Sequence, residues 1–215
     1  MSGFPVILSA PSGAGKTSIR LLLLQRRGDI GYSTSCTTRA PRAGEVNGHD
    51  YHFFTRAEFE AARDRGEFAE WAEVHGNLYG TLRSEIEKTL RAGRHVLMDI
   101  DVQGARQFAA AFPESVLVFI LPPSGEILMS RLSGRGSEDR EKLLTRLRNA
   151  RAEMNEVGRY HYVVVNDDLA RAVEQVSAII DAEGLRHNRV QAVEQQVEAL
   201  IAQLEQEISH FSKGE

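Results

Sequence analysis

The chain has 215 residues, of which 42% are hydrophobic and 26% are charged, and its formal net charge at pH 7 is −4. Such values are typical of one main globular domain, and the acidic balance argues against a nucleic-acid partner, because binding to a phosphate backbone usually requires a basic surface. The single Cys36 cannot form an internal disulfide, and no apolar stretch approaches the roughly 20 residues of a membrane span. We therefore expect a soluble, cytoplasmic protein that binds neither nucleic acid nor membranes.

The predicted elements alternate between strands and helices. Phe4 to Leu8 is a short apolar run, a glycine-rich turn follows it, and residues 17–25 are densely apolar, which indicates a strand, a loop and a helix. Apolar runs without polar alternation predict further buried parallel strands at residues 95–100, 116–121 and 162–165. Helical patterns lie between them at residues 82–91, 125–132 and 169–182, the last two with Ser124 and Asp168 as N-caps. This alternation predicts an α/β fold with a mostly parallel sheet and right-handed crossovers.

Two stretches interrupt the alternation and look like insertions into the sheet core. Residues 35–83 combine short strands at 51–54 and 68–74 with a helix that Thr55 and Glu58 open as a capping box. Residues 132–155 are polar and rich in arginine, which suits a mobile lid. We therefore assign residues 1–34, 84–131 and 156–184 to the core, 35–83 to one insertion, 132–155 to the lid and 185–215 to a C-terminal helical extension.

The C-terminal extension carries a long helical pattern from Leu185 to Phe211. Its apolar residues follow steps of three and four at Val190, Val193, Val197, Leu200 and Leu204, and then slip to Ile208 and Phe211. This is barely two clean heptads, fewer than a coiled coil needs. Docking on the protein's own core and docking on another subunit, in a homo-oligomer, are equally compatible with the pattern.

A phosphate-binding loop follows the first predicted strand. Residues 10–17 read APSGAGKT and match G-x-x-x-x-G-K-[ST], except that Ala10 replaces the first glycine. In such a loop the glycines let backbone N–H groups point inward, the lysine reaches the β and γ phosphates of ATP, and the hydroxyl binds Mg²⁺. An ordinary glycine-rich turn is improbable here, because strand, helix and Gly-Lys-Thr occur together. The predicted ATP-binding residues are Ala10, Pro11, Ser12, Gly13, Ala14, Gly15, Lys16 and Thr17.

Asp99 is the second element of this predicted site. It ends the apolar run HVLMDI, and a carboxylate at the carboxyl end of a parallel strand can hold the metal directly or through water. We therefore predict Mg²⁺ bound by Thr17 and Asp99. Asp101 points to the same side if the strand continues, although an Asp at a strand end is usually a helix cap.

Taken together, seven segments resemble the guanylate kinase family, close to its bacterial members, over residues 4 to about 183. They read APSGAGKT, STSCTTRAPRAGEVNGHDYHF, EFAEWAEVHGNLYGT, DIDVQGA, PPS, RLSGRG and VNDD, in family order. The resemblance implies a P-loop three-layer core with a mostly parallel sheet, an inserted GMP-binding α+β region and a helical lid. It also implies reversible phosphoryl transfer from MgATP to GMP, and to dGMP, for guanine nucleotide metabolism.

The resemblance further implies the residues of the acceptor site. Glu70 is implied as the guanine reader, since a carboxylate can accept hydrogen bonds from N1–H and the 2-amino group, which adenine cannot donate. Arginine and tyrosine side chains suit the phosphate. The implied phosphate ligands are Arg39, Arg42, Tyr51 and Tyr79, and Ser35, Thr81 and Asp101 complete the base pocket.

In the lid, the resemblance implies that Arg131, Arg135 and Arg146 act with Lys16 on the transferring phosphates. Asn166 and Asp167 are implied to lie near the adenine. Singly, each implied residue could be an ordinary core or surface residue, and it is their combination that argues for a site. The acceptor phosphate is largely dianionic at pH 7, so the reaction needs no general base.

Two other functions fit parts of the pattern. A non-catalytic scaffold of the same fold would be expected to have a degraded phosphate loop, whereas GAGKT is intact. A kinase of a sugar phosphate would leave Glu70, Ser35 and Asp101 with nothing to pair with.

Overall fold

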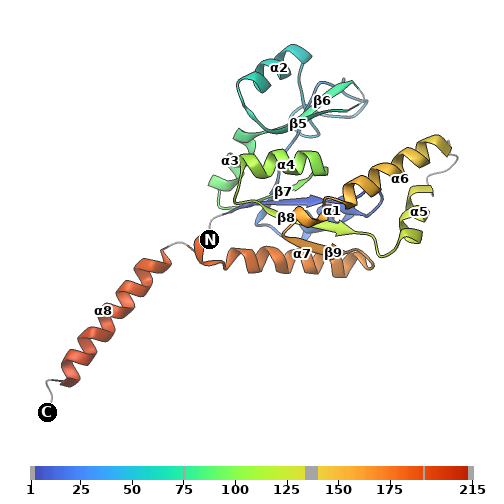
Figure 1. The fold of residues 1–215 in the computed structure, drawn as a ribbon. Coiled ribbons are helices and arrows are strands. Elements are labelled where there is room, and N and C mark those ends of the chain that lie inside the picture. The colour runs from blue at the N-terminus through green and yellow to red at the C-terminus, as the bar shows by residue number, and fades with distance from the viewer. Residues whose placement is uncertain (1–2, 75, 134–139, 191, 213–215) are drawn as a thin grey trace.

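A parallel sheet of five strands forms the centre of the molecule in this computed structural model, which describes residues 3–74, 76–133, 140–190 and 192–212 (Figure 1). The strand order is β2-β7-β1-β8-β9. The strands are β1 (Pro5–Ser9), β2 (Ile30–Tyr32), β7 (His95–Asp99), β8 (Val116–Leu121) and β9 (Tyr162–Val165). The α/β fold and the strands predicted near 4–8, 95–100, 116–121 and 162–165 are thereby confirmed.

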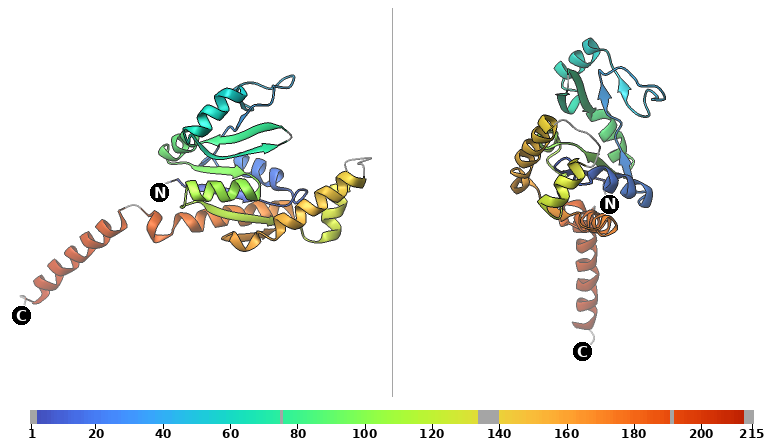
Figure 2. Two further views of the ribbon diagram at one scale, coloured as in Figure 1. Left: turned by 45° about the horizontal axis from the view of Figure 1, so that its top comes forward. Right: turned by 90° about the vertical axis from the view of Figure 1, so that its right-hand side faces the viewer.

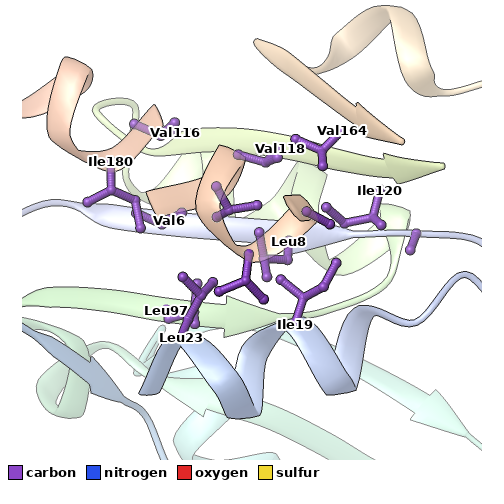
Figure 3. Packing of buried hydrophobic residues seen from close by; sticks show 14 of the residues in the cluster. Val6, Leu8, Ile19, Leu23, Leu97, Val116, Val118, Ile120, Val164 and Ile180 are labelled. Carbon is purple, nitrogen blue, oxygen red and sulfur yellow. The ribbon is translucent and has the colours of Figure 1, made fainter. Parts of the chain in front are cut away.

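Helices cover both faces of this sheet, because successive strand side chains point to opposite sides. On one face Val6 and Leu8 pack with Ile19 and Leu23 of α1 and with Ile180 of α7, as Figure 3 shows. On the other face Ile7 and Val96 pack with side chains of α3 and α4. The covering helices are α1 (Lys16–Arg26), α3 (Arg83–Arg91), α4 (Val102–Ala111) and α7 (Leu169–Gly184).

A smaller sheet stands above the core (Figure 1). Its order is β4-β3-β6-β5, and Phe59, Phe68 and Leu78 form its own small core. The predicted capping box of Thr55 and Glu58 opens its helix. The elements are β3 (Cys36–Thr37), β4 (His52–Phe53), α2 (Arg56–Asp64), β5 (Phe68–Val74) and β6 (Asn77–Leu82).

Two helices, α5 (Gly125–Ser133) and α6 (Arg140–Met154), follow β8. The lid predicted at residues 132–155 contains the end of α5 and the whole of α6. Leu128 and Leu132 of α5 pack against Ala150 of α6. Ser124 caps α5 by accepting a hydrogen bond from the Ile127 amide, at 3.2 Å, as predicted. A short 3-10 turn, η1 (Val157–Arg159), leads from α6 to β9.

The C-terminal extension differs from the predicted continuous helix. A 3-10 turn, η2 (His187–Arg189), and the extended Val190 lie between α7 and α8 (Val193–Ser212), so Val190 lies outside the helix. Ala192 ends this break with a positive φ of 56°. Helix α8 projects away from the rest of the chain (Figures 1 and 2). Docking on the protein's own core is therefore wrong for this structure. In the described part of the chain, no helix is both long and apolar enough to cross a bilayer.

Candidate active site

The phosphate-binding loop connects β1 to α1, as predicted. Gly13 and Gly15 have φ values of 87° and 93°, a region that only glycine adopts without strain. Gly15 is the N-cap of α1 and contributes no side-chain hydrogen bond. The first N–H groups of α1, and the positive end of its dipole, therefore remain available to an anion.

Two of the long-range hydrogen bonds that hold this loop involve Lys16 and Asn166. Lys16 Nζ donates to the Ile100 carbonyl at 2.9 Å, which places the ammonium at the carboxyl end of β7. Asn166 Nδ2 donates to the Ala14 carbonyl at 2.7 Å. Burial lowers the pKa of Lys16, and Asp99 and Asp101 oppose that shift.

A cleft of about 920 Å³ opens over the loop, within the range of about 300–1,000 Å³ that is typical of small-molecule sites. The structure thus brings four separate segments together: the loop, the end of β7, the lid and the VNDD segment. Lys16, Asp101, Arg131, Asn166 and Asp167 all line the cleft.

Asp99 ends β7 next to the loop, since it pairs with Leu8 of β1. Its carboxylate lies 3.4 Å from Arg20 Nε and accepts a hydrogen bond from the Tyr32 hydroxyl at 3.3 Å. Burial and the charge of Asp99 raise the pKa of Tyr32 to about 12. No group of three or more His, Cys, Asp or Glu side chains that could hold a metal occurs among the described residues.

Asp101 does not continue the strand. It is the N-cap of α4, and its Oδ1 accepts a hydrogen bond from the Gly104 amide at 2.7 Å. The strand ends at Asp99 because the backbone turns here to start the helix. Asp101 nevertheless borders the cleft.

In the smaller sheet, Glu70 is only 8% exposed, and it accepts a hydrogen bond from the Thr81 hydroxyl at 2.7 Å. Burial raises the pKa of Glu70, the Thr81 hydrogen bond opposes this, and the charge of Asp101 adds to it. A Cβ atom added to Gly104 would come to 3.1 Å from Glu70 Oε2. Glu70, Thr81 and Asp101 therefore gather where β5 meets α4.

The four predicted phosphate ligands divide into a cluster and an exposed residue. The Arg39 guanidinium lies 5.4 Å from the centre of the Tyr51 ring, and the Tyr51 and Tyr79 rings are 6.2 Å apart. Arg39 also pairs with Glu45 at 2.8 Å. Arg42 is exposed, and its amide donates to the Glu45 carboxylate at 2.7 Å.

Ser35 lies just before β3, and its carbonyl accepts a hydrogen bond from the His52 amide at 2.9 Å. None of the contacts described for its side chain joins it to Glu70.

Among the described residues, Arg146 and Glu153 of α6 make polar contacts with the loop. Arg146 Nη2 lies 3.4 Å from Ser12 Oγ, and Glu153 accepts a hydrogen bond from the Ser12 amide at 3.3 Å. Burial raises the pKa of Glu153 against the opposing Ser12 hydrogen bond and the charge of Lys16. Arg131 Nη2 reaches the Asn166 carbonyl at 3.5 Å. Arg135 lies outside the described residues.

Sequence reasoning missed Arg20, Glu45 and Glu153. Arg20 and Glu153 lie outside the quoted segments, and Glu45 lies inside one of them without an assigned role. Their contacts with Asp99, Ser12 and Arg39 reveal them. Asp167 lines the cleft but forms an ion pair with Arg171.

Comparisons with known proteins agree with this geometry. The family model "Guanylate kinase" matches residues 2–183. A guanylate kinase of Dechloromonas aromatica is 50% identical over 185 residues, which are 86% of this chain and 92% of that protein. A guanylate kinase of Chelativorans is 46% identical over 202 residues, 94% of this chain and 93% of that protein.

A solved structure agrees as well. The crystal structure of guanylate kinase from Anaplasma phagocytophilum superposes with a TM-score of 0.73 at 35% identity, covering 92% of this chain and 95% of that one. The resemblance found in the sequence is confirmed. The chain belongs to the guanylate kinase family, whose members are nucleoside monophosphate kinases that transfer a phosphoryl group from ATP to GMP.

Proposed function

We propose that the chain carries out reversible transfer of the γ-phosphoryl group from MgATP to GMP, and to dGMP, with the residues of the cleft and of the smaller sheet in the roles given below. One observation carries the proposal. Asp101 lines the cleft over the phosphate-binding loop and, with the buried Glu70 of the smaller sheet, borders Gly104: a Cβ atom added there would lie 3.5 Å from Asp101 Oδ1 and 3.1 Å from Glu70 Oε2. A donor site and an acceptor site therefore meet at the start of α4.

For the donor, the N–H groups of residues 13 and 15–17 and the dipole of α1 bind the phosphates, and Lys16 neutralises their charge. Asn166 and Asp167, which line the cleft, are assigned to the adenine of ATP. The position of Asn166 supports a second role, because its amide fixes the Ala14 carbonyl of the loop.

Thr17 and Asp99 are the residues that would hold Mg²⁺. A single carboxylate and a hydroxyl are a typical protein share for this ion, since phosphate oxygens and waters supply the other ligands. The Asp99 carboxylate already contacts Arg20 and Tyr32, which favours contact through water. The bound ion would neutralise charge on the β and γ phosphates.

For the acceptor, Glu70 receives the guanine N1–H and 2-amino hydrogen bonds, with Thr81, Ser35 and Asp101 around it. Arg39, Tyr51 and Tyr79 hold the GMP phosphate, and Arg42 joins them from the exposed turn. The cluster geometry of Arg39 with the two tyrosine rings supports this assignment. Glu45 orients Arg39 toward those rings.

The transfer then needs alignment and charge neutralisation. An oxygen of the dianionic GMP phosphate forms the new bond to the γ phosphorus as the bond to the oxygen of ADP breaks. Lys16, Arg131, Arg135 and Arg146 neutralise the charge that spreads over the transferring group. Arg146 and Glu153 join the lid to Ser12, so lid closure would exclude water that could hydrolyse ATP.

The test is ADP and GDP formation from MgATP and GMP. We expect turnover that EDTA abolishes and added Mg²⁺ restores, and a loss of at least about 100-fold in kcat for Lys16→Met, the scale of removing one group that stabilises the transition state. Lys88→Met, on the exposed side of α3, is the matched control and should behave as wild type. Absence of GDP formation by the wild-type chain would overturn the proposal.

We further propose that α8 pairs with α8 of a second copy of the chain. Its apolar side chains are exposed, among them Leu200 at 58%, Leu204 at 62% and Phe211 at 75%, and such a continuous patch is rare on a monomer. The turn η2, which precedes α8, contacts the core: the Arg189 guanidinium lies 4.0 Å from the Phe4 ring centre and donates to the Glu114 carbonyl at 2.8 Å.

The mass in solution tests this pairing. The full chain should be a dimer or larger, and both truncation after Arg189 and the pair Leu200→Asp with Leu204→Asp should give monomers that keep kcat. Gln203→Asp, also on α8, is the control. An unchanged mass after truncation would contradict the pairing.

The single free Cys36 supports the cytoplasm as the site of action, because that compartment keeps thiols reduced.

A further inference from the structure

Helix α4 connects the ATP cleft with the smaller sheet along one of its faces. Its residues Asp101, Gly104 and Gln107 follow each other at intervals of three and therefore lie on the same side. Asp101 borders the ATP cleft, Gly104 lies against the Glu70 carboxylate, and Gln107 contacts the next residue of β5, Trp71. Gln107 has no place in the proposed chemistry.

Gln107 binds the backbone of β5 in both directions. The Trp71 amide donates to Gln107 Oε1 at 3.1 Å, and Gln107 Nε2 donates to the Trp71 carbonyl at 3.0 Å. Because β5 is the last strand of the smaller sheet, this side of its backbone faces no other strand. The side-chain amide of Gln107 thus replaces the peptide group of a neighbouring strand at one residue.

We propose that Gln107 is a positioning residue for GMP: it fixes β5 on α4 so that Glu70 stands at the correct distance from Asp101. The inference rests on the proposed role of Glu70 as guanine reader. Gln107 itself does not touch GMP. Gln107 acts through the backbone, because Glu70 and Trp71 are adjacent in β5. Holding both the amide and the carbonyl of Trp71 also holds the backbone from which the Glu70 side chain extends.

The contact is specific to the acceptor side. Lys16, Ser12 and Asn166 make no described contact with Gln107 or Trp71, so loss of the Gln107 amide should leave the ATP site intact. Gln107 is exposed and lies in a helix that the buried Ala105 and Phe108 anchor to the core. A change at Gln107 should therefore leave the fold intact as well.

The test uses Gln107→Met, which keeps the length of the side chain and removes both hydrogen bonds. Gln107→Glu keeps an acceptor for the Trp71 amide but has no donor for its carbonyl. Gln175→Ala, an exposed glutamine in the middle of α7, is the matched control. For each full-length variant, kcat, KM for GMP and KM for ATP are measured, together with Tm.

Trp71 provides a second readout, because it is the chain's only tryptophan. Its ring packs on the far side of β5 near the Arg63 guanidinium, at 5.3 Å. The Kd for GMP can therefore be followed by Trp71 fluorescence without ATP. We expect Gln107→Met to raise the Kd and KM for GMP about tenfold, the factor that corresponds to two exposed hydrogen bonds. Gln107→Glu should show a smaller rise, and KM for ATP and Tm should stay at the wild-type values.

Two results would overturn the inference: a KM for GMP of Gln107→Met within twofold of wild type, or an equal rise in KM for ATP and GMP, which would indicate a general structural role. The proposed function fails separately. If the wild-type chain forms no GDP, the function itself is refuted, whereas normal wild-type turnover with an unaffected Gln107→Met refutes only the role of Gln107.

Discussion

Asn166 holds the phosphate-binding loop by a hydrogen bond to the Ala14 carbonyl. Its replacement by alanine should show how much the stability of the loop depends on this bond. The side chain is 5% exposed, and its Nδ2 donates to the fully buried Ala14 at 2.7 Å. Asn166→Ala leaves the Ala14 carbonyl without this donor. A buried polar group left unpaired costs about 1–3 kcal/mol.

For a chain of this size, about 1 kcal/mol shifts Tm by about 2–4 °C, so a loss of about 2 kcal/mol lowers Tm by about 4–8 °C. If ATP binding must restore the order of the loop, KM for ATP rises by up to about 30-fold, which is the same free energy. Asn166→Asp should be worse, because it places a carboxylate oxygen against the Ala14 carbonyl.

Thermal unfolding and steady-state kinetics measure both quantities, and KM for GMP should change little. The exposed Asn188, in η2, supplies the control variant Asn188→Ala. The reasoning is refuted if Asn166→Ala unfolds within about 1 °C of wild type and keeps its KM for ATP.

Three further predictions concern the acceptor side. Gly104→Ala places a Cβ 3.1 Å from Glu70 Oε2, so KM for GMP should rise. Tm should not fall, because alanine favours the helix by up to about 1 kcal/mol. A fall in Tm with an unchanged KM for GMP would contradict this prediction. Burial raises the pKa of Glu70, so its ionised fraction, and with it GMP binding, should decline on acidification from a higher pH than for an exposed glutamate. In Glu70→Gln, the pH profile of KM for GMP should lose the contribution of the Glu70 carboxylate and keep that of the GMP phosphate. Identical profiles for the wild type and Glu70→Gln would refute this prediction. Burial raises the pKa of Cys36 to about 12, so a thiol reagent should modify it only on unfolding, and rapid reaction of the native chain would contradict the structure.

Much of the core could be predicted, since uninterrupted apolar runs identify buried parallel strands. The runs at 116–121 and 162–165 coincide with β8 and β9. The patterns did not predict β2, β3, β6 and α4. Gly80 interrupts the sequence pattern of β6, since glycine weakens a strand signal. Strands of two or three residues are too short for a periodic signal, and α4 contains Gly104, which weakens a helical pattern and is needed where α4 approaches Glu70.

The apolar residues of the C-terminal extension show a second limit of prediction from the sequence. Docking on the core and docking on another subunit bury the same apolar face, so periodicity cannot distinguish them. The break after Arg189 has no strong pattern either, because Val190 and Val193 keep the helical spacing across it. The contacts of Arg189 with Phe4 and Glu114, far away in the sequence, fix where α8 leaves the core.

For the candidate active site, sequence motifs predict which residues take part, but they do not predict which groups those residues contact. The loop spacing predicts the cradle without predicting that Lys16 donates to Ile100. Asp99 is predicted as a metal ligand, and its pairing with Arg20 and Tyr32 depends on the packing of α1 and β2. The roles assigned to the site residues remain proposals that the variants above test.

The central claim is that the buried Glu70 makes this phosphotransferase specific for guanine. The most direct measurement offers GMP, AMP, CMP and UMP separately with MgATP and compares kcat/KM for the wild type and Glu70→Gln. We predict rapid ADP formation with GMP alone and a strong loss of kcat/KM for GMP in Glu70→Gln, since unmet hydrogen bonds at such sites discriminate by about 10⁴-fold or more. Comparable turnover of AMP by the wild type, or an undiminished kcat/KM for GMP in Glu70→Gln, would contradict the account.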